Sequence, residues 1–110
     1  MRRVPPQPDT VVCTYRVRRG EEAAFRDLLD LHWPTLRELG LVQDVPALRF
    51  QGTEPDGGPF FVEIFTWRDA RAVEEAHHSG AVQSVWGQMS EHCEERGGRP
   101  AMEFPHVERL

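Results

Sequence analysis

The chain has 110 residues, 39% of them hydrophobic and 28% charged, which is typical of one globular domain and too short for a second. Its formal net charge of -5 leaves no broad basic surface that could neutralise phosphates, so we expect no nucleic-acid partner. No segment approaches the roughly 18 apolar residues of a membrane-spanning helix, so we expect no membrane partner either.

The first ten residues combine Arg2 and Arg3 with three prolines and contain no apolar core of a signal peptide. We therefore expect residues 1–10 to form an extended or disordered tail, residues 11–110 to form a single domain, and the protein to be cytoplasmic. Cys13 and Cys93 lack the spacing of a metal site or a disulfide framework, which predicts two buried thiols.

Residues 11–18 alternate in polarity and predict a half-buried strand. Two glutamates after Gly20 then open a helix, since negative charge is favourable at a helix N-terminus, and Gly40 supplies its stop. Pro34 lies inside this helix and has no N–H to donate, so we expect a kink near His32.

Two further strands are predicted at residues 46–53 and 60–67. The segment between them, residues 54–58, contains Asp-Gly-Gly and is typical of a hairpin turn, because glycine permits positive φ. Residues 101–107 predict a short last strand, in which Pro105 indicates an edge position or a bulge.

Two helices fill the stretch before that last strand. Asp69 is the expected N-cap of a short helix to His77, and Ser79 that of a longer helix to Glu95. The order strand, helix, strand, strand, helix, helix, strand predicts an α+β fold of the ferredoxin-like βαββαβ type, with a four-stranded antiparallel sheet. Helices cover one face of such a sheet, so we expect the other face to pair with a second copy in a homodimer.

Three segments resemble one known superfamily. They are the first strand running through Gly20 into a helix with Phe25, the segment FFVEIFTW followed by Asp69, and AHHSGAVQSVW at residues 76–86. On these segments the chain resembles the dimeric α+β barrel superfamily, within it the antibiotic-biosynthesis-monooxygenase-like group. The resemblance implies a dimer with a pocket between sheet and helices. In that pocket some members oxidise phenolic polyketides with molecular oxygen and no flavin, metal or haem, so we expect no cofactor.

Three side chains are candidates for proton transfer. His32 falls on the apolar stripe of the first helix, and His77 lies at the C-terminal end of the short helix. Glu63 is a carboxylate on an otherwise aromatic strand face, where desolvation would make it a base. The structural alternatives are a core histidine bonded to a backbone carbonyl, a capping histidine, and a salt bridge from Glu63 to Arg16 or Arg49.

The candidate substrate-binding residues are aromatic: Tyr15, Trp33, Trp67 and Trp86. Their flat rings are suited to a small apolar or aromatic ligand, although core packing explains them as well. No histidines have the spacing of a metal chelate, so we expect no metal site.

Two functions from different classes stay open. The first is a cofactor-independent monooxygenase acting on an aromatic or polyketide-like compound, with His32 or His77 as general base. The second is a non-catalytic small-molecule-binding or structural homodimer, and an isomerase or cyclase of the same fold is a further alternative. An open cavity that reaches the two histidines favours the first over the second.

Overall fold

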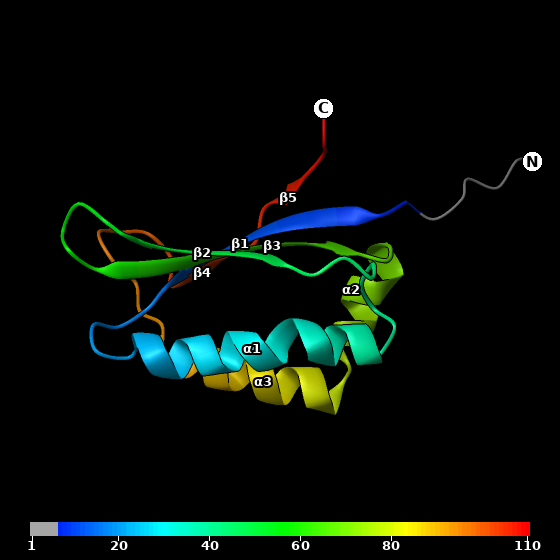
Figure 1. Cartoon of the computed structure of the whole chain (residues 1–110), viewed down its shortest axis with the longest axis horizontal. Coiled ribbons are helices and arrows are strands. Elements are labelled where there is room, and N and C mark those ends of the chain that lie inside the picture. The colour runs from blue at the N-terminus through cyan, green and yellow to red at the C-terminus, as the bar shows by residue number, and fades with distance from the viewer. Residues whose placement is uncertain (1–6) are drawn as a thin grey trace, which may run out of the picture.

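The computed structural model describes residues 7–110 and consists of one antiparallel sheet with three helices on one side (Figure 1). The elements are β1 (Asp9–Arg16), α1 (Glu22–Glu38), β2 (Leu48–Thr53), β3 (Pro59–Trp67), α2 (Ala70–His77), α3 (Gly80–Glu91), β4 (Met102–Glu103) and β5 (His106–Val107). This order confirms the predicted ferredoxin-like α+β fold. The expected tail at residues 1–10 lies largely outside the described residues, and its last two residues belong to β1.

The sheet has the strand order β2-β3-β1-β4, with β5 also paired to β1. β4 and β5 are two halves of the predicted last strand, because both pair with β1 in one continuous register. Pro105 has no N–H to donate, yet its carbonyl still accepts from the Val12 amide at 3.0 Å. The strand therefore lies at the sheet edge, interrupted by proline but without a bulge.

The ends of the helices follow local chemistry. α1 ends in a Schellman motif, in which Gly40 has a φ of 70° and the Leu41 amide donates to the Leu36 carbonyl. The helix continues unbroken through Pro34. The predicted end of α3 at Glu95 was wrong: α3 stops at Glu91, because the chain then turns to run beside the end of β1, where the Glu94 amide donates to the Arg16 carbonyl.

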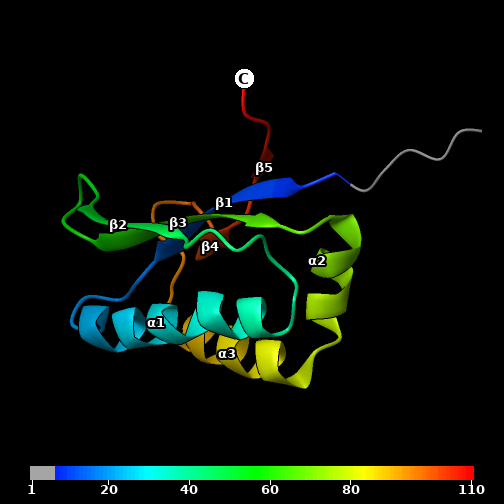
Figure 2. The same cartoon turned by 45° about the vertical axis from the view of Figure 1, so that its right-hand side comes forward.

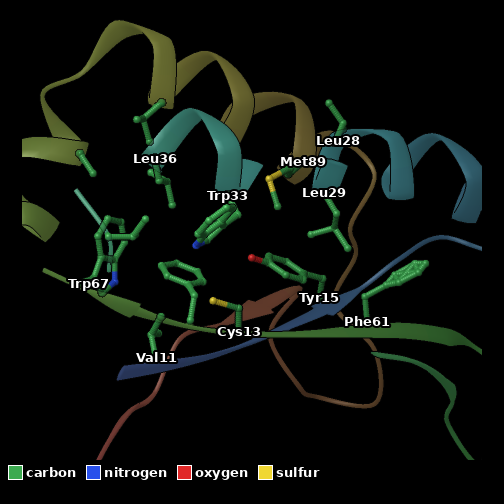
Figure 3. Close-up of a cluster of buried hydrophobic side chains, with 14 of the residues drawn as sticks. Val11, Cys13, Tyr15, Leu28, Leu29, Trp33, Leu36, Phe61, Trp67 and Met89 are labelled. Carbon is green, nitrogen blue, oxygen red and sulfur yellow. The ribbon is translucent and has the colours of Figure 1, made fainter. Parts of the chain in front are cut away.

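The core lies between the helices and the inward face of β1 and β3 (Figure 3). Side chains alternate between buried and half-buried positions from Val11 to Tyr15 in β1 and throughout β3, as the period of two requires. Phe25 of α1 stacks on Phe61 of β3, with the two ring centroids 5.2 Å apart. The ring of Phe25 also packs against that of Tyr15, with centroids 5.0 Å apart. This packing fixes α1 over the centre of the sheet.

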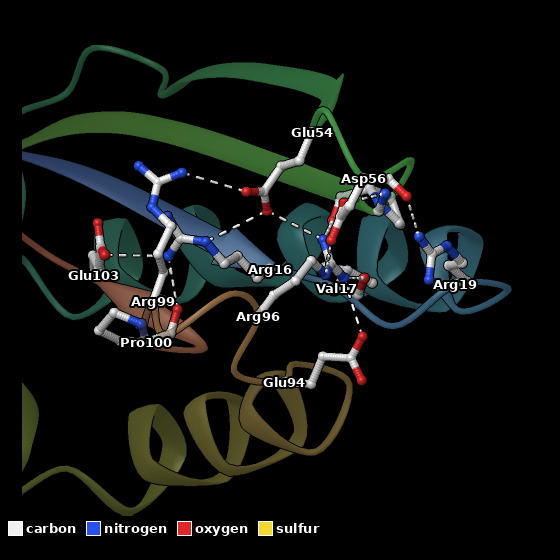
Figure 4. Close-up of polar contacts among 12 residues, drawn as sticks. Arg16, Val17, Arg19, Glu54, Asp56, Glu94, Arg96, Arg99, Pro100 and Glu103 are labelled. Atoms are coloured by element: carbon white, nitrogen blue, oxygen red, sulfur yellow. Dashed lines mark hydrogen bonds and ion pairs between the residues drawn. The ribbon is translucent and has the colours of Figure 1, made fainter.

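A cluster of charged side chains closes one end of the sheet (Figure 4). Glu54, next to the β2–β3 turn, accepts ion pairs from Arg16 at 3.4 Å, Arg96 at 3.2 Å and Arg99 at 3.4 Å. Arg96 also donates to the Val17 carbonyl at 2.7 Å. The cluster ties the hairpin to the segment after α3 and occupies the guanidinium of Arg16.

The opposite face of the sheet has no helix over it (Figures 1 and 2). Large apolar side chains on this face are exposed, among them Leu48 at 59%, Phe50 at 55% and Val107 at 41%. In the described part of the chain, no helix has both the length and the apolar composition needed to cross a membrane.

Candidate functional site

A cavity of about 170 Å³ lies between the inward face of the sheet and helices α1, α2 and α3. Its lining is almost entirely apolar or aromatic, and three histidines are the exceptions. The lining residues are Val11, Cys13, Tyr15, His32, Phe65, Trp67, Val73, His77, Trp86, Met89, Met102, Phe104 and His106. The cavity therefore suits a flat apolar ligand that meets an imidazole.

His32, Glu63 and Tyr15 form a buried polar group at this cavity. Nδ1 of His32 lies 2.8 Å from Oε1 of Glu63, and the Tyr15 hydroxyl donates to the same oxygen at 2.8 Å. Glu63 is 0% exposed and His32 is 3% exposed. The other carboxylate oxygen, Oε2, has no hydrogen-bond partner among residues 7–110. The Glu63 carboxylate thus lies behind the His32 imidazole, which borders the cavity.

The second ring nitrogen of His32 fixes its tautomer. Nε1 of Trp86 lies 2.9 Å from Nε2 of His32, and an indole N–H can only donate. Nε2 is therefore an acceptor without a proton, and the ring proton resides on Nδ1, which donates a hydrogen bond to Glu63. The order Trp86, His32, Glu63, Tyr15 is a continuous chain of hydrogen bonds.

Burial and the Glu63 carboxylate keep the neighbouring acids protonated. Desolvation, and after it the charge of Glu63, raises the pKa of Tyr15 well above its ordinary value of 10. The same two causes, in the same order, raise the pKa of the Cys13 thiol. Tyr15 is therefore a hydrogen-bond donor at neutral pH, and Cys13 is an unreactive wall of the cavity.

The remaining sequence candidates occupy different places. Trp67 lines the cavity and packs edge-on against Phe65 with ring centroids 5.2 Å apart. His77 is exposed at the rim, where its ring meets that of Trp86 at 5.0 Å and makes no hydrogen bond within residues 7–110. Trp33 does not line this cavity. It projects from α1 into the core (Figure 3) and borders a separate hollow beside Pro46 and Arg49.

The expected salt bridge from Glu63 to an arginine is not formed. Arg16 is occupied by Glu54 and by Glu103 at 3.2 Å, and Arg49 reaches Asp30 on α1 instead. Both arginines are therefore paired with other carboxylates, which leaves Glu63 with His32 and Tyr15 as its hydrogen-bond neighbours.

Sequence reasoning missed one wall of the cavity. Met102, Phe104 and His106 line it from the last strand, and His106 is held by Asp9 of β1 at 2.8 Å. Their alternation along one strand was the signal that could have placed them on the face of Tyr15, with which Met102 pairs. Within residues 7–110, no three or more His, Cys, Asp or Glu side chains are grouped as metal ligands.

Comparison with solved structures bears on the fold. A Bordetella bronchiseptica protein, provisionally named an antibiotic biosynthesis monooxygenase, matches with a TM-score of 0.72 and 12% identity, over 94% of this chain and 97% of its own. Another antibiotic biosynthesis monooxygenase matches with a TM-score of 0.66 and 12% identity, over 93% and 98%. The chain has the antibiotic biosynthesis monooxygenase-like fold.

The same monooxygenase-like fold is found in SnoaB from Streptomyces nogalater, a cofactor-independent oxygenase. A mutant of that protein matches with a TM-score of 0.66 and 12% identity, over 93% of this chain and 92% of its own. No protein-family model and no curated protein sequence matches the chain. At these identities the shared property is the fold.

Proposed function

We propose that this protein is a cofactor-independent monooxygenase that acts on a small aromatic compound carrying a hydroxyl group, with His32 as general base. The observation that carries the proposal is the contact of 2.8 Å between His32 and the fully buried Glu63 beside an apolar cavity. The shared fold with a cofactor-independent oxygenase adds support.

Glu63 acts in this proposal through His32. A carboxylate that accepts a hydrogen bond from Nδ1–H holds the imidazole in the tautomer with Nε2 bare, and it stabilises the imidazolium that forms when Nε2 takes a proton. Tyr15 holds the same carboxylate oxygen from the other side. Glu63 is therefore an orienting carboxylate in this scheme rather than the base itself.

The substrate supplies the electrons. His32 takes the hydroxyl proton, and the resulting phenolate passes one electron to oxygen. The phenoxyl radical and superoxide then join at a ring carbon, forming a C–O bond. Protonation of the peroxide, loss of the ring C–H proton and cleavage of the O–O bond give a quinone and water. One oxygen atom enters the product and the other leaves as water, so no external reductant is needed.

The size and lining of the cavity define the substrate class. At about 170 Å³ it lies below the roughly 300–1,000 Å³ of sites for drug-sized ligands, which favours one or two fused rings over a larger polyketide. Its apolar walls would keep water away from the radical pair.

Oxygen uptake with 1-naphthol in the presence of a metal chelator tests this function. We expect formation of the quinone with one oxygen molecule consumed per substrate, and His32→Ala should reduce the rate at least about 100-fold. His78→Ala is the matched control, because His78 is exposed and does not line the cavity. Equal rates in His32→Ala and the wild type, or no turnover of any two-ring phenol, would contradict the proposal.

A non-catalytic ligand-binding protein is the second candidate. It is favoured by the fact that both ring nitrogens of His32 are already hydrogen bonded, Nδ1 to Glu63 and Nε2 to Trp86. A protein of this kind would bind two-ring phenols without consuming oxygen, which the same experiment detects.

We also propose that the protein is a homodimer in which the two uncovered sheet faces meet. The exposed Leu48, Phe50 and Val107 on that face support this arrangement, because large apolar side chains exposed on one sheet face favour an interface.

A further inference from the structure

Trp86 is hydrogen bonded to Nε2 of His32, the nitrogen with which the proposed base would take a proton. Its indole N–H donates to Nε2 of His32 at 2.9 Å, and Nε2 carries the only free lone pair of the ring, since Nδ1 holds the proton donated to Glu63. A ligand hydroxyl and the indole N–H therefore compete for one acceptor. His32 is able to take a proton from a ligand only when Trp86 has moved away.

We propose that Trp86 is a gate, which closes the empty cavity and is displaced when a ligand hydroxyl replaces the indole N–H on His32 Nε2. This inference rests on the proposed role of His32. It assigns the ligand class by chemistry: the site accepts aromatic compounds with a free hydroxyl and discriminates against their methyl ethers. An ether cannot donate, so its entry would leave the buried Nε2 without a partner.

The surroundings of Trp86 allow such a movement. Trp86 shares a face of α3 with the fully buried Val82 and Met89, but its side chain is only half-buried, so part of the indole reaches the surface. Its ring contacts the exposed ring of His77, and this imidazole makes no hydrogen bond within the described residues. Outward rotation of the indole thus breaks one hydrogen bond, to His32, and the ring contacts with His32 and His77.

Exchange of one donor for another is nearly balanced in free energy. An indole N–H and a phenol O–H each form one hydrogen bond to the same imidazole nitrogen, so the apolar area of the ligand decides whether it enters. The displaced indole also leaves volume behind, which would enlarge the cavity for a two-ring ligand. Selection for a hydroxyl and accommodation of the ring then follow from the same movement.

Spectra of the protein with ¹⁵N-labelled tryptophan test the gate without any turnover. The chain has three tryptophans, and Trp86→Phe identifies the indole signal of Trp86 by its absence. Under anaerobic conditions, 2-naphthol should shift the Trp86 indole N–H signal as its bond to His32 is lost. The signal of Trp33, which lies outside the cavity, serves as the control and should stay in place. 2-Methoxynaphthalene should leave the Trp86 signal unchanged.

Affinities give the second readout. Removal of the competing N–H in Trp86→Phe should tighten the binding of 2-naphthol about two- to tenfold, which corresponds to one net hydrogen bond. A Trp86 signal that stays in place while 2-naphthol shifts the Trp67 signal would overturn the proposal. So would equal affinity for the phenol and its ether, or no binding of 2-naphthol to the wild-type protein.

The outcome separates the gate from the oxygenase. If 2-naphthol displaces Trp86 but no oxygen is consumed with 1-naphthol, the gate is supported and the proposed reaction is refuted. If 1-naphthol is oxidised but the Trp86 signal stays in place with 2-naphthol bound, the reaction is supported and the gate is refuted.

Discussion

Glu63 has one carboxylate oxygen with two donors and one with none. Oε1 accepts from Tyr15 and is in contact with His32 Nδ1, while Oε2 is buried without a partner among residues 7–110. A buried carboxylate with no cation is costly, and an apolar side chain at this position would pack without that cost. Stability alone therefore does not account for Glu63, and its effect on His32 does.

Glu63→Gln separates these two effects. The variant keeps the side-chain volume and an oxygen that accepts both donors, so we expect it to fold. Because the amide cannot stabilise an imidazolium as a carboxylate does, turnover of 1-naphthol should fall about 100-fold or more. Oxygen uptake and thermal unfolding measure the two properties. Tyr15→Phe, which keeps the carboxylate and removes one donor, should lose less activity, and a Glu63→Gln variant with wild-type turnover would refute the role given to Glu63.

The raised pKa of the buried Cys93 thiol predicts how the free energy of unfolding changes at high pH. Burial raises the pKa of Cys93 from 9.0 to about 12, so the folded state favours the thiol. This contribution to the free energy of unfolding is complete below the unfolded pKa of about 9 and is lost as the pH rises from 9 to about 12. Urea unfolding across this range should show the decline, with a shallower slope in Cys93→Ala. Rapid reaction of either thiol with Ellman's reagent in the native protein would contradict this picture.

Periodicity predicted which side chains point inward but not which of them touch. The strand period placed Glu63 with Phe61 and Phe65, and the helix period placed His32 towards the sheet, as the structure has them. The contact between these two residues depends on where α1 crosses β3, which no local pattern encodes. The expected arginine partners of Glu63 were wrong for the same reason, since charges distant in the chain compete for them.

The caps of α2 and α3 were predictable from the sequence. The Asp69 carboxylate accepts from the Ala72 amide at 2.9 Å, and the Ser79 hydroxyl accepts from the Val82 amide at 3.4 Å. The end of α3 was not predictable, because it depends on the pairing of the following segment with the end of β1, including the bridge between Val17 and Cys93. Local chemistry starts these helices, and tertiary contact ends α3.

The Asp69 cap at the start of α2 predicts that stability falls in acid. The hydrogen bond from Arg68, followed by that from the Ala72 amide, lowers the pKa of Asp69 from 3.8. A lowered pKa means that this contribution to stability is present above pH 3.8 and is lost as the pH falls through the folded-state value. Asp69→Ala should therefore have a lower Tm than the wild type at pH 7, and the gap should close in acid. Asp69→Asn, which retains a capping oxygen, should lie between them at neutral pH.

The uncovered sheet face predicts the oligomeric state of the protein. A chain of this size with exposed Leu48, Phe50 and Val107 on one face is expected to bury them against a second copy. Native mass spectrometry should give twice the chain mass, and Phe50→Glu should shift the population to monomer. Gln51→Glu adds the same charge to the same strand on the other face and should leave the dimer intact. A wild-type monomer at micromolar concentration would contradict the arrangement.

In the proposed site, Glu63 holds the proton of His32 on Nδ1, which leaves Nε2 open to a ligand once Trp86 moves. Spectra of protein labelled with ¹⁵N-histidine report the two ring nitrogens separately, and His32→Ala identifies the signals. We expect this tautomer, with a protonated Nδ1 and an unprotonated Nε2, for His32 in the empty protein. A proton on Nε2 with Nδ1 bare would contradict it.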